Sequence, residues 1–530
     1  MAQITTEPAI WSSLDWSQLY DNDPMRNMQR RQIALEVLNQ IKQGQHVALD
    51  AKTGAGKAII MILAHLGLEW NTLFVVPTVE LAYQHQKLFQ KLTGHHRGTL
   101  VMTGNKSPLK RTMLWHDDNP KLVFATPHVI MNDINKKIYP FGYFPLLVID
   151  EFHHAHYHYP FVPLAERANR GGAIICSLSA TADDLFALKN CFVTKIVKAD
   201  IKMPKKISCT TVVQPTKSLS QADDYCRDLL TITAEELADL HLVSKTTPWL
   251  TEHQLINANE VAEQLPYPKN KDAVSAIGRY RSLSHMRYLL NLCSYQNYLW
   301  YADNLYNRTE KYTEWIINHQ RFNELTNLVR QFIANDEPHP KVAQFIKTAC
   351  YRVEQGDNFI AFVKEKITGR YLAEQLSNHG LKVDVAFGGA ERKHIKEVRQ
   401  LMESELINGI IATSVLAEGV SLPSVDTIIH YDRPLTKVER IQKDGRAGRG
   451  YKPGLIIPLM LNYPSEWAGG EKTSPAVPQQ PQLPKSNTGW LFPPEEMLKT
   501  EKTNTPNLPF TEEDDKTSFK GIPRLILDNK

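Results

Sequence analysis

The stretch "LDAKTGAGKAIIM", residues 49–61, decides the fold of the first part of the chain. It joins the end of a short apolar run, which predicts a buried strand, to the apolar segment 59–70, which predicts a helix. Gly54 and Gly56 let backbone N–H groups turn toward a ligand, and Lys57 stands where the helix begins. A strand, a glycine-rich turn with a lysine and a helix N-terminus together predict a phosphate-binding loop.

The loop departs from G-x-x-x-x-G-K-[ST] at two positions: Ala51 replaces the first glycine, and Ala58 replaces the hydroxyl that ligates Mg²⁺. Because Mg²⁺ usually keeps several waters and is held mainly by phosphates and a carboxylate, water can take the place of that hydroxyl. We therefore expect ATP and Mg²⁺ to bind and hydrolysis to be weakened rather than lost. The residues expected to bind the nucleotide here are Thr53, Gly54, Ala55, Gly56, Lys57 and Ala58.

An acidic pair follows a second apolar run in "LLVIDEFHHAH", residues 146–156. Asp150 would hold Mg²⁺ through water, and Glu151 would take the proton from the attacking water. The alternative is a solvated acidic pair. The position of the pair at a strand end, downstream of a phosphate-binding loop, favours the catalytic interpretation.

Four histidines follow this acidic pair: His153, His154, His156 and His158. A zinc site is one interpretation, but four imidazoles within six residues cannot all converge from one strand-to-helix turn, and no cysteine or carboxylate completes a separate set. The preferred interpretation is that His153 hydrogen-bonds toward the γ-phosphate or toward the other domain.

Short apolar runs alternate with helix-like segments in two regions, from Val47 to about residue 200 and again over 357–462. In the first region, the predicted strands are the run before the phosphate loop and the runs at 72–76, 121–125, 145–150 and 173–179. This alternation predicts two doubly wound α/β domains with parallel sheets.

Residues 217–349, between the two α/β regions, have helical spacing instead. One predicted buried helix face consists of Phe322, Leu325, Val329 and Phe332. The aromatic-rich segment 288–316 is either core or a surface on which bases stack, and aromatic residues at helical spacing are more often core.

The second region ends in "ERIQKDGRAGRG", residues 439–450. Arg446 and Arg449 stand three residues apart beside glycines, so both guanidinium groups can point toward a γ-phosphate held by the first domain. Hydrolysis would then depend on closure of the two domains. The alternative is a basic helix on the surface.

Composition limits the classes of protein. The 530 residues carry a formal net charge of +4, so a nucleic-acid partner would bind in local grooves rather than through a global basic field. Six cysteines without a C-x-x-C pair suggest neither a zinc ribbon nor a disulfide framework. No leader-like N-terminus and no apolar run of about 18 residues is present, which predicts a cytoplasmic protein without a membrane partner. The Pro-rich segment 463–530 predicts a disordered tail that could dock a protein partner.

Eight motifs in order resemble those of the superfamily 2 helicases of the DExH kind. They are "RNMQ" (26–29), "AKTGAGKA" (51–58), "PTVELAYQ" (77–84), "ATPHVIMND" (125–133), "DEFH" (150–153), "SAT" (179–181), "ATSVLAEGVSLPSVD" (412–426) and "QKDGRAGR" (442–449). The motif at 125–133, the helical insertion and the lead-in "HPKVAQFIKTA" (339–349) resemble the Hef group and its RNA-sensing and Dicer-type relatives. No nuclease motif follows, so nuclease activity is not implied.

The resemblance implies a role for each matching position. Gln29 would read the adenine, and Gly419 would couple the ribose side of the nucleotide to closure. Ser179 and Thr181, with His153, would link hydrolysis to movement. The catalytic set implied is Lys57, Asp150, Glu151, Gln442, Arg446 and Arg449, and the strand-phosphate contacts implied are Thr78, Thr126 and Thr413. Lys443 replaces the first arginine usual in the last motif, which keeps the charge but loses the bidentate fork.

We therefore expect a lead-in at 1–25, a RecA-like motor domain at 26–205, a linker and helical insertion at 206–349, a second RecA-like domain at 350–462 and the tail. The expected function is a monomeric, nucleic-acid-dependent ATPase that unwinds, translocates on or remodels duplex or branched nucleic acid, with DNA favoured over RNA. The alternative is an ATP-gated sensor or clamp with little turnover because of Ala58. A P-loop kinase or transporter ATPase accounts for neither "SAT" nor "QKDGRAGR".

Overall fold

The computed structural model describes the following residues: 6–19, 23–95, 98–117, 122–139, 142–156, 159–180, 182–243, 249–388, 392–413, 424–434, 436–448 and 452–462. By their contacts they form two units. One unit takes in the described residues of 1–207, 414–428 and 434–455, and the other takes in those of 208–413, 429–433 and 456 onward. The predicted tail, 463–530, lies outside the described residues.

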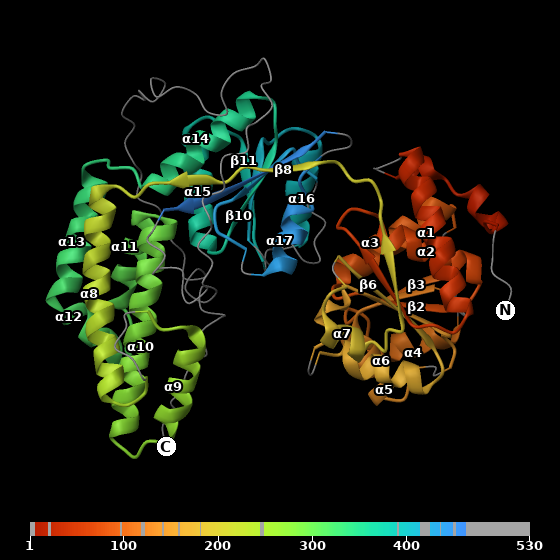
Figure 1. Ribbon diagram of the computed structural model, residues 1–530, viewed down its shortest axis with the longest axis horizontal. Helices are drawn as coiled ribbons and strands as arrows, with labels where there is room; N and C mark the ends of the chain where they lie inside the picture. Colours follow the sequence, from red (N-terminus) through yellow and green to blue (C-terminus); the bar gives the residue numbers. More distant parts are fainter. Residues whose placement is uncertain are drawn as a thin grey trace. The chain divides into compact units, whose positions relative to one another are not determined.

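The first unit is built on a seven-stranded sheet in the order β3-β4-β2-β5-β6-β1-β7, and its neighbouring strands pair in parallel (Figure 1). The strands are β1 (Val47–Ala51), β2 (Thr72–Val75), β3 (Thr99–Met102), β4 (Leu122–Ala125), β5 (Leu146–Asp150), β6 (Ile174–Ser179) and β7 (Lys195–Ala199). The five predicted strands of this region are confirmed as β1, β2, β4, β5 and β6.

Two strands of this sheet, β3 and β7, do not correspond to any predicted apolar run. Both are edge strands, and β7 alternates between exposed and buried positions along part of its length. The first two residues of β3, Thr99 and Leu100, are only half-buried. A continuous apolar run is the pattern of a strand covered on both faces, so that criterion finds the central strands and not the edges.

Helices cover both faces of the first sheet, as the doubly wound prediction requires. They are α1 (Pro24–Lys42), α2 (Lys57–Leu68), α3 (Val79–Thr93), α4 (Pro108–Asp117), α5 (Pro127–Asn135), α6 (Phe161–Arg170) and α7 (Leu185–Asn190), with 3₁₀ turns at Ala9–Ser13, Trp16–Gln18 and Phe152–His154. One core contains α1, α2 and α3, and the other contains residues of α4 to α7. Trp11 joins the first core, where its indole Nε1 donates to the Leu63 carbonyl at 2.9 Å.

The segment 217–349 is helical. Its elements are α8 (Lys217–Asp239), α9 (Glu252–Gln264), α10 (Lys269–Tyr288), a π-helical turn (Leu289–Cys293), α11 (Tyr295–Leu305), α12 (Lys311–Asn318), α13 (Gln320–Ala334) and α14 (Pro340–Glu354). The predicted face of α13 is confirmed, because its four apolar residues are all buried. Tyr295, Tyr298 and Tyr301 are buried as well, so this part of the aromatic-rich segment is core.

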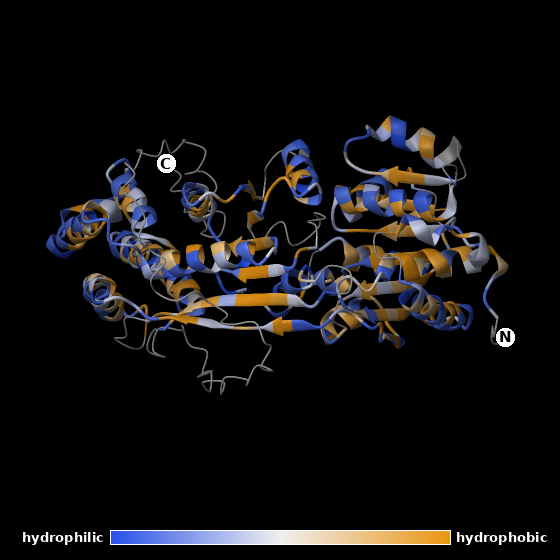
Figure 2. Ribbon diagram, turned by 90° about the horizontal axis from the view of Figure 1, so that it is seen from above, coloured by the Kyte–Doolittle hydropathy of each residue, from blue (hydrophilic) through white to orange (hydrophobic). Residues whose placement is uncertain are grey.

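A second sheet follows in the order β11-β12-β10-β13-β14-β8, and β9 pairs with β14. Its strands are β8 (Lys206–Ser208), β9 (Thr211–Val213), β10 (Phe359–Val363), β11 (Val383–Ala386), β12 (Gly409–Thr413), β13 (Thr427–His430) and β14 (Gly454–Leu461), and its helices are α15 (Lys366–Asn378), α16 (Arg392–Glu403) and α17 (Lys437–Asp444). β10, β12 and β13 are buried along their whole length, and most of their residues are apolar. Figure 2 shows that many of the strands carry the colour of hydrophobic residues. Within the described part of the chain, no helix has the length and apolar character that crossing a membrane requires.

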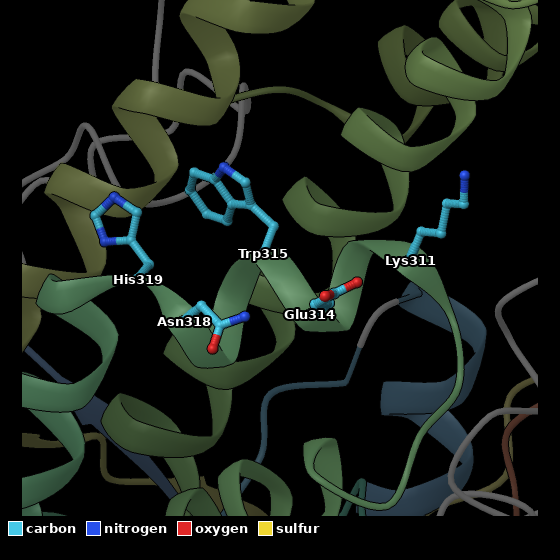
Figure 3. A pocket seen from close by; sticks show the side chains of 5 residues that line it. All are labelled: Lys311, Glu314, Trp315, Asn318 and His319. Atoms are coloured by element: carbon cyan, nitrogen blue, oxygen red, sulfur yellow. The ribbon is translucent and has the colours of Figure 1, made fainter.

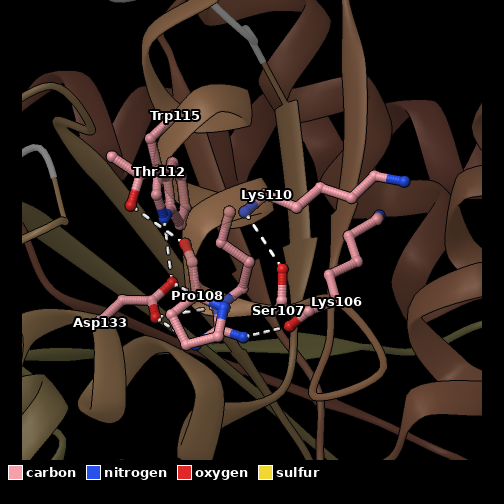
Figure 4. A network of polar contacts seen from close by, with 8 residues as sticks. Lys106, Ser107, Pro108, Lys110, Thr112, Trp115 and Asp133 are labelled. Atoms are coloured by element: carbon pink, nitrogen blue, oxygen red, sulfur yellow. Dashed lines mark hydrogen bonds and ion pairs between the residues drawn. The ribbon is translucent and has the colours of Figure 1, made fainter.

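A buried polar network fastens α4 to α5 near the ends of β3 and β4 (Figure 4). The Asp133 carboxylate is fully buried and accepts hydrogen bonds from Arg111 Nε at 2.9 and 3.0 Å and from Arg111 Nη2 at 2.7 Å. Trp115 Nε1 donates to the same carboxylate at 3.1 Å. The guanidinium also donates to the Lys106 carbonyl, which ties the loop after β3 to the same network.

Asp133→Ala should destabilise this part of the first unit by about 3–5 kcal/mol, because it leaves the Arg111 guanidinium buried without its counter-charge. Hydrogen exchange of the β3 and β4 amides measures the local free energy of opening. Glu166→Ala is the matched control, since the Glu166 carboxylate is exposed and pairs with Arg170 at 3.9 Å, and the change should alter that free energy by less than about 1 kcal/mol. Equal decreases of the local free energy of opening in both variants would contradict the stabilising role of the Asp133–Arg111 pair.

Candidate nucleotide site and nucleic-acid edge

Three neighbouring strands of the first sheet, β5, β6 and β1, end at one edge and carry the residues predicted to bind and hydrolyse ATP. Ile149 pairs with Ser177, and Ser179 pairs with Asp50, so the three strand ends are level. Asp150, Ser179 and the loop after Ala51 therefore lie at the same carboxyl edge. Ligands of open parallel sheets bind at this kind of edge.

The phosphate loop has the backbone that a bound anion needs. Gly54 and Gly56 have φ values of +85° and +93°, in the left-handed region that glycine adopts without strain. Gly56 is the N-cap of α2, so the first N–H groups of that helix open toward the loop. Thr53 Oγ1 is buried and has no hydrogen-bond partner among the described residues. These features fit the phosphates of a nucleotide.

Arg30, one residue after the predicted adenine reader, supports the loop from α1. Its side chain is 1% exposed, and its Nε donates to the Ala55 carbonyl at 3.0 Å. A Cβ at Gly56 would lie 2.7 Å from that Nε, so only glycine fits there beside the guanidinium. Arg30 could not be predicted from the sequence, because nothing local distinguishes it from Arg26 and Arg31 of the same helix.

Lys57 and the acidic pair lie together at the edge. Lys57 Nζ is 3.6 Å from Glu151 Oε1, and His153 Nδ1 is 3.5 Å from Glu151 Oε2. Glu151 has a φ of +51°, in the left-handed region that residues with a side chain adopt less often than glycine. The structure thus brings Lys57, Asp150, Glu151 and His153 into one site.

Burial raises the pKa of the Asp150 carboxyl, but the hydrogen bond from His85, the charges of His85 and Lys57 and the Glu151 N–H outweigh it and hold that pKa below its usual value. Asp150 is therefore ionised, as a magnesium carboxylate must be. Burial, followed by the charges of His154 and Lys57, lowers the pKa of His153 to about 3. His153 is neutral at physiological pH and can act only as a neutral hydrogen-bonding group.

The described histidines after the acidic pair do not share one partner. The rings of His153 and His154 lie 4.3 Å apart between centroids, but His153 faces Glu151, whereas His154 stacks on Tyr159 at 5.7 Å. His156 Nε2 lies 2.7 Å from Asp184 Oδ2. Among the described residues, no group of three or more His, Cys, Asp or Glu side chains could hold a metal ion.

The other residues predicted to act on the nucleotide have different surroundings. Gln29 Oε1 accepts a hydrogen bond from the Lys202 N–H at 3.2 Å, so this end of the amide is held by the protein's own backbone. Gln442 is 5% exposed, and its Oε1 has no hydrogen-bond partner within the described segments. The segment with Gln442 and the half-buried Arg446 belongs by its contacts to the unit that holds the phosphate loop. Lys443 is buried and pairs with Glu439 at 2.7 Å.

The three threonines predicted to contact a strand stand at the ends of buried strands. Thr78 follows β2 and caps α3, accepting from the Leu81 N–H at 3.3 Å. Thr126 follows β4, is buried and begins α5. Thr413 ends β12 in the second sheet and accepts from the Gly388 N–H at 3.0 Å. In the first sheet, β4 pairs with β2 and β2 pairs with β5, so the strand ends that carry Thr126 and Thr78 continue the edge that holds the nucleotide residues.

An open groove with a volume of about 510 Å³ lies along α12 in the helical insertion (Figure 3). Its lining residues are Lys311, Glu314, Trp315, Asn318 and His319. The Trp315 ring lies 4.7 Å from the His319 ring, and the Arg279 guanidinium lies 5.2 Å from the Trp315 ring. Lys311, Glu314 and Trp315 of the aromatic-rich segment 288–316 line this groove, and Trp315 is the aromatic residue among them. No predicted motif residue contributes to it.

Four predicted residues lie outside the described residues: Thr181, Gly419, Arg449 and His158.

Comparison with known families decides the superfamily. Residues 31–187 match the DEAD/DEAH box helicase family, and residues 340–451 match the helicase conserved C-terminal domain. Together these matches span just over half of the chain. The chain belongs to the superfamily 2 helicases.

Individual helicases show the same relationship. MJ1505 of Methanocaldococcus jannaschii, which carries the name of an ATP-dependent RNA helicase, is 26% identical over 75% of this chain and 54% of its own length. The ATP-dependent DNA helicase mph1 of Sclerotinia sclerotiorum is 23% identical over 78% of this chain and 38% of its own length. The Pyrococcus furiosus Hef helicase domain shares the fold, with a TM-score of 0.62, 22% identity and coverage of 83% of this chain and 98% of that chain. This helicase thus spans about half or less of the two curated relatives.

Glu151→Gln should lower ATP turnover by about 10²–10⁴-fold, because the amide keeps the size of the side chain but cannot take a proton. Nucleotide affinity should stay within about threefold, since Asp150 and Lys57 are unchanged. Steady-state ATPase assays and the fluorescence of a labelled nucleotide measure the two quantities. Glu166→Gln, on the exposed face of α6, is the control and should behave as wild type. Undiminished turnover in Glu151→Gln would remove Glu151 from the mechanism.

Proposed function

We propose that this helicase is a nucleic-acid-dependent ATPase that unwinds, translocates on or remodels duplex or branched DNA. The observation that carries the proposal is the meeting of three segments at one sheet edge. The phosphate loop follows β1, Asp150 and the acidic turn lie at the end of β5, and Ser179 ends β6. Lys57 of the loop lies 3.6 Å from Glu151 of the turn.

The described residues divide the work on ATP. The loop N–H groups and Lys57 would bind the phosphates, and Gln29 would contact the base. Asp150, with water at the position left by Ala58, would hold Mg²⁺, which neutralises phosphate charge when bound. Because Lys57 interacts with Glu151 in this structure, phosphate binding would draw the ammonium away and leave the Glu151 carboxylate able to accept a proton from water.

The two arginines of the last motif would act on the transition state. Arg446 and Arg449 are proposed to stabilise the charge that develops on the transferred phosphoryl group, as arginine fingers do. Gln442, whose buried Oε1 has no hydrogen-bond partner in the described part of the chain, stands one turn before Arg446 and would contribute to the same surface.

DNA is the proposed substrate, with Thr78, Thr126 and Thr413 contacting its phosphates. Contacts to phosphate carry no sequence information, which suits a motor that moves along many sequences. Two observations on relatives bear on the choice: mph1 is named as a DNA helicase, whereas MJ1505 is named as an RNA helicase. The cytoplasmic location, the monomeric state and a protein partner for the tail stay predictions.

The ATP-gated clamp is the less favoured function. The argument for it is Ala58, but the lysine, both acidic residues and Arg446 are all present, and a decayed motor loses Lys57 or Glu151 first.

ATPase activity measured in parallel with single-stranded DNA, forked DNA, double-stranded RNA and no nucleic acid tests the proposal. Forked or single-stranded DNA should raise turnover at least about tenfold above the rate without nucleic acid, and more than RNA does. Greater stimulation by double-stranded RNA would assign the substrate to RNA. Equal, near-zero rates in all four reactions would favour the clamp.

Ala58→Thr should lower the Mg²⁺ concentration that gives half-maximal turnover and raise DNA-stimulated turnover, because it restores a direct oxygen ligand. Ala58→Val is the matched control, since valine has nearly the shape of threonine without the hydroxyl. Steady-state ATPase against Mg²⁺ concentration separates the variants. Identical Mg²⁺ curves for the threonine and valine variants would contradict the role of water at this position.

A further inference from the structure

Helix α3 connects the two halves of the first sheet's carboxyl edge. It begins after Thr78, a predicted strand contact, and carries His85 seven residues later. At 1.5 Å per residue, these positions are about 10 Å apart along the axis. His85 Nε2 lies 3.0 Å from Asp150 Oδ2, so a helix that starts at the nucleic-acid half contacts the magnesium carboxylate of the nucleotide half.

The contact is fixed on both sides. His85 is 6% exposed and Asp150 is 5% exposed. The His85 ring packs against Phe74 of β2 and Phe124 of β4, with centroids 5.1 and 6.3 Å away. The ring therefore cannot swing away from the carboxylate unless core aromatic side chains move with it.

Two hydrogen-bond donors fix the orientation of the Asp150 carboxylate. His85 Nδ1 is buried and has no hydrogen-bond partner among the described residues, so the ring meets Asp150 through Nε2 alone. Because an ionised carboxylate can only accept, Nε2–H donates to Asp150 Oδ2, and the Glu151 N–H donates to Oδ1 at 3.0 Å. One donor belongs to β5's own turn and the other to α3.

We propose that His85 is a positioning residue that couples strand binding at the start of α3 to the orientation of the Asp150 carboxylate. The inference rests on the proposed function. A small displacement of α3 on strand binding is transmitted by the stiff helix to His85, which turns the carboxylate relative to the phosphate loop. Partners that orient a metal-binding carboxylate commonly change metal affinity or activity 10–100-fold when they are removed.

The test compares His85→Phe with His85→Gln. Phenylalanine keeps the aromatic packing between Phe74 and Phe124 but cannot donate, whereas the glutamine amide can replace Nε2–H. His85→Phe should reduce the ratio of DNA-stimulated to basal turnover at least about tenfold. It should also raise the Mg²⁺ concentration required for half-maximal binding of fluorescent ADP by a similar factor. DNA affinity should stay within about twofold, and His85→Gln should restore most of the ratio.

His65→Phe is the matched control. His65 is also buried in the first core, and its Nδ1 lies 2.9 Å from Thr72 Oγ1, but it does not contact Asp150. It should lower thermal stability and leave the stimulation ratio unchanged. A wild-type ratio and wild-type Mg²⁺ dependence in His85→Phe would overturn the inference.

A measurement on the unmodified chain gives a second test that does not depend on how the variants fold. Saturating forked DNA should lower the Mg²⁺ concentration required for half-maximal binding of fluorescent ADP, and no shift would contradict the coupling. Failure of this coupling can be distinguished from failure of the proposed function. If no nucleic acid stimulates the wild type, the function fails, whereas a stimulated wild type with an unaffected His85→Phe rejects only the coupling.

Discussion

The level, parallel ends of β5, β6 and β1 are the constraint on which the candidate site depends. Each strand end delivers one component: the acidic turn, Ser179 and the phosphate loop. No two of these components are close in sequence, and only the pairing of the strands brings them to one edge. The buried apolar side chains that hold the sheet therefore also set the distance between Lys57 and Glu151.

The central strands and the main site residues could be predicted from the sequence, because both have local signatures. A strand covered on both faces is a continuous apolar run, and a phosphate loop needs its glycines and lysine within a few positions. The edge strands β3 and β7 lack that run. The same limit applies to His85 and Arg30, whose roles depend on contacts with Asp150 and Ala55 that are distant in sequence.

The polar groups around the site explain how it can tolerate Ala58. Asp150 is held ionised and oriented by His85 and the Glu151 N–H, and the loop is shaped by Arg30. A preorganised carboxylate and phosphate cradle leave only one magnesium position to be filled by water. The hydroxyl usual at position 58 then adjusts the affinity for Mg²⁺ rather than deciding whether ATP is hydrolysed.

The central claim is that this phosphate loop, despite Ala58, supports turnover driven by nucleic acid. ATP turnover of the full chain with saturating forked DNA and Mg²⁺, compared with that of Lys57→Ala, tests it most directly. The account predicts that wild-type turnover exceeds that of the variant by at least about 100-fold, because the ammonium acts on phosphate charge inside the site. Wild-type and Lys57→Ala rates that cannot be distinguished would contradict it.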